Sequence, residues 1–215
     1  VQCPLPDSSN IRQETSKRLM LELSCAIARK RKCGLELMHV SPIPQDGGEK
    51  AYKDFSPEEQ QAIIEKSIKF LEPLRKILEE KQDVSFGLSG IAAQDIPDHI
   101  HRMVWRANTD VLVMPVEQFS ALKRGFLRLE LQRVLREVKC DLVVVKIGAD
   151  DSLPKKILIP FASNPHNFLV KEIVAGLMEY LEVSPTFLLV ENGTSEEKKL
   201  KRLGKELASL GFTPE

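Results

Sequence analysis

Short apolar runs alternate with longer amphipathic segments along the whole chain. Runs such as Leu35–Val40 and Val111–Met114 are typical of strands that are buried on both faces of a sheet. Longer segments, such as Ile11–Lys32, carry apolar residues at helical spacing, as expected of a helix with one buried face. Because the two kinds of segment alternate, the sequence predicts an α/β protein with a mainly parallel sheet.

The same patterns give bounds for each expected element. Strands are predicted at residues 1–5, 35–40, 84–88, 110–115, 141–147, 156–161 and 186–190. Helices are predicted at residues 11–32, 56–78, 96–108, 127–140, 168–181 and 195–210. The first helix is expected to end at the cations Arg29–Lys32 and at Gly34. Ser56 and Pro57 mark the start of the second helix, which Pro73 is expected to kink or break.

The segment Asp110–Ile147 reads as strand, loop, helix and strand, and the rest of the chain is organised around it. A helix between two buried strands is typical of a parallel β-α-β unit. Ligands of such sheets bind beyond the carboxyl ends of the strands. The loop Pro115–Phe126 is therefore where we expect a binding function.

After Gly148–Pro154 the strand–helix–strand pattern begins again. Pro4 lies 35 residues before His39 in the next strand, and Pro160 lies 30 residues before Val190, and these similar separations indicate an internal duplication. We predict one subdomain at residues 1–150 and the first half of a second, similar subdomain at residues 151–215. Because the chain begins with valine rather than methionine, we also expect it to be part of a longer protein.

Composition and charge exclude several classes of function. The 215 residues include 31 Lys and Arg and 31 Asp and Glu, so the overall charge does not favour nucleic acid or an acidic substrate. The four cysteines have neither CxxC nor zinc-site spacing and are interpreted as reduced thiols of an intracellular protein: Cys3, Cys25, Cys33 and Cys140. No apolar run reaches the ~20 residues that a membrane-spanning helix needs.

No catalytic residue, cofactor or metal is predicted. The sequence has no nucleophile elbow, phosphate-binding Walker loop or HExxH motif. His99 and His101 are two residues apart on a predicted helix and so face different directions, which does not suit a metal site. Asp95 and Asp98 are interpreted as charges at the start of that helix rather than as an acid–base pair. We therefore expect a protein that is not an enzyme.

Four segments carry a resemblance to the universal stress protein family. They are PLPDSS at the end of the first strand, LELMHV in the second, VLVMP in the fourth and CDLVVVKI in the fifth. In order and spacing the chain resembles this family over Val1–Ile147, and Lys156–Glu215 resembles the first half of another copy. The resemblance implies a doubly wound, flavodoxin-like parallel sheet and a homodimer.

Many members of that family bind ATP through a glycine-rich loop after the fourth strand. Glycines let backbone N–H groups approach the phosphates closely, and a following hydroxyl adds a donor. The matching positions here are Pro115, Gln118, Arg128 and Leu129, so all three glycines and the hydroxyl are absent. Gly125 matches none of them. We therefore expect no cofactor.

Four other residues remain candidates if a nucleotide does bind. The family's first-strand aspartate, which faces the base and ribose, has a near match in Asp7. Lys123, Arg124 and Arg128 could hold phosphate by charge alone. Nucleotide binding would then depend on cations rather than on a backbone cradle.

A duplicated module without the glycines also resembles the carboxyl-terminal domains of cation–chloride cotransporters and related amino-acid permeases. That resemblance implies a regulatory, dimerising domain at the cytoplasmic face of the cell membrane, in contact with the membrane domain of its own chain. The run Arg29–Lys32 is then a candidate contact for anionic lipid, although helix ends often carry such cations. This transporter domain is our first hypothesis. The alternative is a free-standing tandem universal stress protein that binds ATP or another adenine nucleotide.

Overall fold

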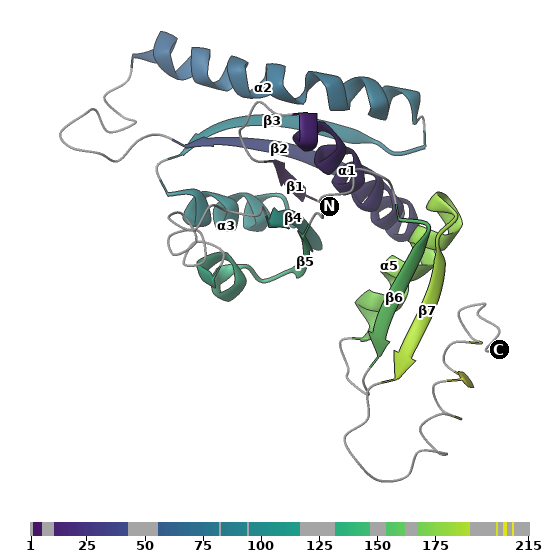
Figure 1. Cartoon of the computed structure of the whole chain (residues 1–215). Coiled ribbons are helices and arrows are strands. Elements are labelled where there is room, and N and C mark those ends of the chain that lie inside the picture. Colours follow the sequence, from purple (N-terminus) through teal and green to yellow (C-terminus); the bar gives the residue numbers. More distant parts are fainter. Residues whose placement is uncertain are drawn as a thin grey trace. The chain divides into compact units, whose positions relative to one another are not determined.

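A computed structural model describes most of the chain and divides it into two compact units, Val1–Ser152 and Leu153–Glu215 (Figure 1). The described residues are 2–5, 11–42, 56–81, 83–93, 95–116, 132–146, 154–161, 167–189 and the four positions 201, 204, 205 and 208. Each unit is described by itself below.

The first unit is built on a parallel five-stranded sheet. Its strands are β1 (Gln2–Leu5), β2 (Leu35–Pro42), β3 (Phe86–Ala93), β4 (Val111–Val116) and β5 (Asp141–Lys146). They lie in the order β3-β2-β1-β4-β5, and all neighbours are parallel. This arrangement confirms the predicted doubly wound, flavodoxin-like sheet.

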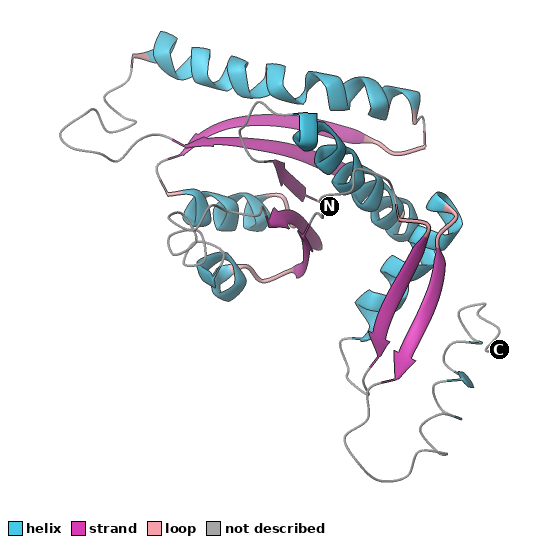
Figure 2. Ribbon diagram, viewed as in Figure 1, coloured by secondary structure: helices cyan, strands magenta, loops and turns pink. Residues whose placement is uncertain are grey.

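Helices cover both faces of this sheet (Figure 2). Helices α1 (Ile11–Arg31) and α2 (Pro57–Glu80) lie on one face, and α3 (Ile96–Arg106) and the helical residues 132–137 lie on the other. Right-handed crossovers produce this division, because β1 to β3 progress in one direction across the sheet and β3 to β5 in the other.

Alternate side chains of β2 supply the cores on the two faces. Met38 and Val40 pack in a cluster with Leu112 of β4 and with Ile100 and Val104 of α3. On the opposite face, the ring of His39 packs against Phe70 of α2 with the ring centroids 4.2 Å apart. Leu37 shares that face and is fully buried. Burial of both faces accounts for the nearly continuous apolar run that marked this strand in the sequence.

Three helices end on a residue in the left-handed conformation that is not glycine. These residues are Lys32 after α1, Asn108 after α3 and Glu182 after α5 (Asn167–Leu181), with φ values of 52°, 47° and 53°. For α1 the sequence suggested Gly34 as the end signal, but Lys32 makes the turn. Its amide donates to the carbonyl of Arg29, and the amide of Cys33 donates to that of Ala28.

Strand β3 differs most from its prediction, since it spans Phe86–Ala93 rather than residues 84–88. Its glycines and serine have low strand propensity, which concealed its length in the sequence. The strand forms because it pairs along its whole length with β2 and because Gly90 lets α2 approach closely. A Cβ at Gly90 would lie 2.6 Å from the carbonyl oxygen of Ile64 and 2.9 Å from Cβ of Ser67.

Helix α2 continues through Pro73, so the predicted break does not occur. Leu71 and Leu74 on either side of the proline are buried against the rest of the unit, and this packing outweighs the lost hydrogen bond. At its start, Ser56 and Glu59 form the reciprocal capping contacts that the sequence suggested.

The second unit contains β6 (Lys156–Phe161), α5 (Asn167–Leu181) and β7 (Ser184–Leu189). The two strands are parallel, with Lys156 beside Ser184 and Phe161 beside Leu189. This order and pairing match those of β1, α1 and β2 in the first unit. Residues 201, 204, 205 and 208 are helical.

The close approach at Gly90 gives a test of this packing. Gly90→Ala should destabilise the first unit by about 1–3 kcal/mol, because the carbonyl of Ile64 belongs to the helix backbone and cannot rotate away. Urea unfolding followed by the fluorescence of Trp105, the one tryptophan in the chain, measures this change.

Gly34→Ala is the matched control. A Cβ there would lie 3.2 Å from the Oγ atom of Ser85, a side chain that can rotate, so we expect a smaller loss. Equal losses in the two variants would contradict the assigned role of Gly90.

Candidate functional site

The strand order places the first candidate site at the carboxyl ends of β1 and β4. From β1 the chain proceeds to β2 and β3 on one side, and β4 and β5 lie on the other, so the direction switches between β1 and β4. Gln2 pairs with Leu112 in parallel register, which brings Leu5 level with Pro115. Sheets of this kind bind ligands at such a switch point. We call this region the carboxyl-edge site.

The candidate residues of the carboxyl-edge site lie outside the described residues. These are Asp7 after β1, and Lys123, Arg124 and Arg128 after β4, together with Gln118, Gly125 and Leu129. Their arrangement therefore stays a prediction. Pro115 is described, and it lies within β4 opposite Val145 of β5 rather than in the loop. The position that matches the family's first glycine is thus extended strand, and it has no N–H to donate.

Next to this region, Asp95 caps α3 and is held by two donors. Its carboxylate accepts a hydrogen bond from the amide of Asp98 at 3.0 Å and another from Arg133 at 2.9 Å. The amide and the guanidinium both favour the ionised form and hold the pKa of Asp95 below its usual range. Asp95 is therefore a structural cap, as its place in the sequence suggested.

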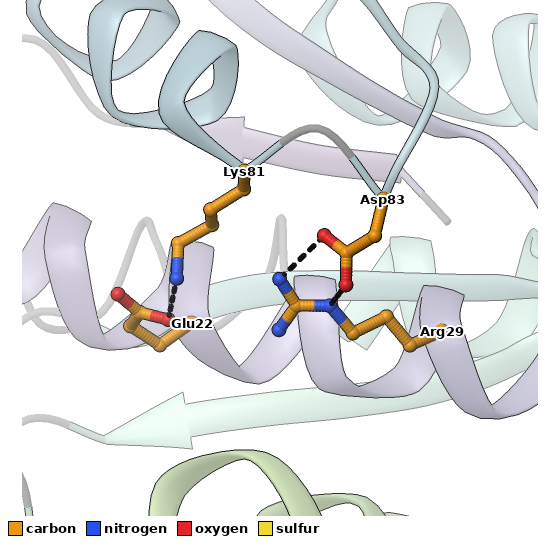
Figure 3. Close-up of polar contacts among 4 residues, drawn as sticks. All are labelled: Glu22, Arg29, Lys81 and Asp83. Atoms are coloured by element: carbon orange, nitrogen blue, oxygen red, sulfur yellow. Dashed lines mark hydrogen bonds and ion pairs between the residues drawn. The ribbon is translucent and has the colours of Figure 1, made fainter.

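The cations at the end of α1 have partners within the first unit. Arg29 binds Asp83 through two hydrogen bonds of 2.5 Å and 2.8 Å (Figure 3). Arg31 binds Asp141 at 2.9 Å. The guanidinium of Arg29 holds the pKa of Asp83 below its ordinary value. Lys30 and Lys32 are exposed. A lipid contact through this run stays a prediction, and Arg29 and Arg31 are already engaged by carboxylates.

A buried ion pair lies about two turns away from Arg29 on the same helix (Figure 3). Glu22 of α1, whose side chain is 6% exposed, accepts a hydrogen bond of 2.8 Å from Lys81 at the end of α2. Together with the Arg29–Asp83 pair, this contact ties α1 to the connection between α2 and β3. This pair could not be predicted from the sequence, because Glu22 is not one of the apolar residues that mark the buried face of the helix.

Burial shifts the pKa values of Cys25 and His99. Burial raises the pKa of the Cys25 thiol to about 11, an effect that Arg29 and Lys81 partly offset. Burial also lowers the pKa of His99. Within the described ranges, no three His, Cys, Asp or Glu side chains are grouped so that they could hold a metal ion.

A second candidate site lies at the opposite ends of the strands, and it was not predicted from the sequence. A pocket of about 430 Å³ opens beside the amino ends of β2 and β3 and the residues that precede β4. We call it the amino-edge pocket. Its walls are formed by residues 33–36, 85–87 and 107–110. The one signal available in the sequence was a glycine or asparagine in each wall, namely Gly34, Gly87 and Asn108, and these residues are equally common in ordinary turns.

Comparison with known proteins identifies the fold. No family model and no curated protein matches the chain. Among solved structures, a universal stress protein from Archaeoglobus fulgidus DSM 4304 aligns over 99% of this chain and 74% of its own, at 12% identity and a TM-score of 0.58. This chain has a universal-stress-protein-like fold.

Two further structures are similar. A putative universal stress protein from Pseudomonas aeruginosa UCBPP-PA14 aligns over 99% of this chain and 70% of its own, at 15% identity and a TM-score of 0.52. A universal stress family protein from Burkholderia pseudomallei covers 67% of this chain and 94% of its own, at 14% identity and a TM-score of 0.44. At these identities the similarity establishes the fold alone.

The comparisons do not connect the chain with cation–chloride cotransporters or amino-acid permeases. In the part of the chain that the structure describes, no helix is both long and apolar enough to cross a membrane.

The buried ion pair gives the second test. Lys81→Met should destabilise the first unit by about 3 kcal/mol or more, because it leaves the carboxylate of Glu22 buried without its partner. The double variant Glu22→Leu, Lys81→Met should lose less than the single variant, since no buried charge remains. Urea unfolding followed by Trp105 fluorescence measures both.

Lys76→Met is the control, because Lys76 is an exposed residue of the same helix and its loss should cost less than about 0.5 kcal/mol. If the double variant lost as much as Lys81→Met, the buried charge would not be the cause.

Proposed function

We propose that this chain is a tandem universal-stress-protein-like protein that binds an adenine nucleotide at the carboxyl-edge site and acts through binding rather than catalysis. The observation that carries the proposal is the strand order, which puts the ends of β1 and β4 side by side at a switch point. The similarity to two universal stress protein structures over 99% of the chain supports it.

The residues that follow β1 and β4 fit an anionic ligand. Asp7 comes two residues after the end of β1, and Lys123, Arg124 and Arg128 follow β4 in the sequence. An aspartate suits ribose hydroxyls, and three cations suit phosphates. Because the glycines of the family's loop are absent, charge replaces most of the backbone N–H donors in the contact with phosphate.

Calorimetric titration of the chain with ATP and magnesium tests this function. We expect a dissociation constant in the micromolar range, which Arg128→Ala should raise by about tenfold, equivalent to about 1.4 kcal/mol. Arg75→Ala is the matched control, since Arg75 is a half-exposed cation of α2 that forms ion pairs with Glu72 and Glu79 of the same helix. No measurable heat at millimolar ATP would reject nucleotide binding.

The same titration separates this proposal from the transporter-domain hypothesis. The loss of all three glycines is the observation that favours a transporter domain, in which the loop would contact protein instead of nucleotide. If the chain binds no nucleotide, the transporter-domain hypothesis is favoured instead.

We also propose that the chain forms a homodimer through the edge of the sheet at β5. Among the strands that the structure describes, β5 pairs with β4 alone, and its Val144 is 41% exposed. Leu135 in the preceding helical residues is 52% exposed, so the two side chains give this edge an apolar character. Unpaired strand edges with apolar side chains are prone to pair with a second chain.

Sedimentation equilibrium tests the dimer. We expect the wild-type chain to sediment as a dimer and Val144→Lys to weaken the association by about tenfold or more. Trp105→Lys, which removes a larger exposed apolar side chain from α3, should leave it unchanged. A monomeric wild-type chain at micromolar concentration would contradict the proposal.

A further inference from the structure

The amino-edge pocket lies in the first unit, at the end of the sheet opposite to the carboxyl-edge site. Its volume of about 430 Å³ falls within the range of roughly 300–1,000 Å³ that is usual for small-molecule pockets. Phe86, which is half-buried, contributes apolar surface to its walls, and Ser85 and Thr109 contribute hydroxyl groups. A pocket of this size suits an organic molecule better than a bare ion.

One carboxylate in this pocket is held in position by its neighbours. Glu36 of β2 lies directly beside Gly87 of β3, and Ser89 donates a hydrogen bond to its Oε1 atom. The other oxygen of Glu36 lies against Gly87, where any Cβ would overlap it. The absence of a side chain at residue 87 is therefore what allows the carboxylate to lie across β3.

The lining of the pocket is negative. Its charged residues are Glu36 and Asp110, and none of the eleven described residues that form its walls is Lys, Arg or His. Outside the walls, Arg29 and Arg31 are bound by Asp83 and Asp141, and the cations next to the walls, Lys30, Lys32 and Arg106, are exposed. A ligand in this pocket therefore meets two carboxylates from different walls.

Two helix ends add to this negative character. Helix α1 ends at Arg31, just before the wall residue Cys33, and α3 ends at Arg106, just before Ala107. The carboxyl-terminal end of a helix carries a partial negative charge. The turn after α3 is fixed by hydrogen bonds from the amides of Asn108 and Thr109 to the carbonyls of Trp105 and Val104, at 3.3 Å and 3.0 Å. This wall is thus already formed without a ligand.

We propose that the amino-edge pocket binds a small organic cation, a molecule that carries a primary ammonium or guanidinium group on a short carbon chain. Glu36 receives the cationic group, Asp110 provides a second negative charge, and Phe86 contacts the carbon chain. Guanidinium and ammonium groups form their strongest hydrogen bonds with carboxylates. The proposal does not depend on nucleotide binding, because it concerns residues at the other end of the strands.

Agmatine, which has both a guanidinium and an ammonium group, is the probe. The first readout is Trp105, which is 78% exposed in the last turn of α3, close in sequence to the wall residues 107–110. The second is the rate at which iodoacetamide alkylates Cys33, a wall residue, compared with Cys140, which lies outside the pocket. Peptide mapping by mass spectrometry separates the two thiols.

We expect about 10 mM agmatine to slow alkylation of Cys33 several-fold and to leave Cys140 unchanged, with the uncharged 1-butanol giving no protection. In Glu36→Gln, where Ser89 can still donate to the amide oxygen, the agmatine concentration that gives half-maximal protection should rise by about tenfold. Glu65→Gln, on the exposed side of α2, should behave as wild type. Gly87→Ala, which displaces the carboxylate, should lose protection as Glu36→Gln does.

The proposal is overturned if agmatine protects Cys33 no better than 1-butanol does. It is also overturned if Glu36→Gln is protected as well as wild type, or if Cys33 and Cys140 are slowed equally. A change in Trp105 fluorescence that saturates over the same agmatine range as the Cys33 protection supports it.

Discussion

The central place of β1 in the sheet constrains the whole first unit. This strand of four residues has β2 on one side and β4 on the other, so both of its edges are paired. To reach β4 from β3, the chain must cross back over the sheet on the opposite face, and α3 makes that crossing. The two layers of helices, the buried strands and the switch point between β1 and β4 all follow from this one arrangement.

Polar contacts then fix the helices on the sheet. On the face covered by α1 and α2, Glu22 and Arg29 hold the end of α2 and the turn before β3. On the other face, Asp95 at the start of α3 binds Arg133, which belongs to the helical residues 132–137. Each contact joins elements that are far apart in the sequence, which makes the unit cooperative. The candidate sites lie at the two ends of the strands: the carboxyl-terminal ends of α1 and α3 lie next to the amino-edge pocket, and Asp7 and Arg128 follow β1 and β4 in the sequence.

Apolar runs and capping residues predicted several elements correctly. The runs Val111–Met114 and Leu142–Val145, the helix start at Ser56 and the bounds of β6 could all be read from these local signals. Burial on both faces was expected of both runs, but Val111–Val113 are fully buried whereas Val144 is 41% exposed. Strand β3 could not be read correctly, because its residues form a strand only through pairing with β2 and packing against α2. The Glu22–Lys81 pair and the amino-edge pocket also depend on contacts between distant residues, which a single sequence does not encode in any local pattern. For the carboxyl-edge site, the sequence predicted a location and candidate residues; the fold shows that β1 and β4 are neighbours at a switch point, and the site itself stays a prediction.

The central claim is that charge, rather than a glycine-rich backbone cradle, holds the phosphates of a nucleotide at the carboxyl-edge site. The dependence of ATP affinity on salt concentration tests this claim most directly, because salt screens contacts between exposed charges and affects backbone hydrogen bonds much less. The account predicts that affinity falls by about tenfold or more when sodium chloride is raised from about 50 mM to about 500 mM. An affinity that stays constant over that range, or the absence of binding at low salt, would contradict it.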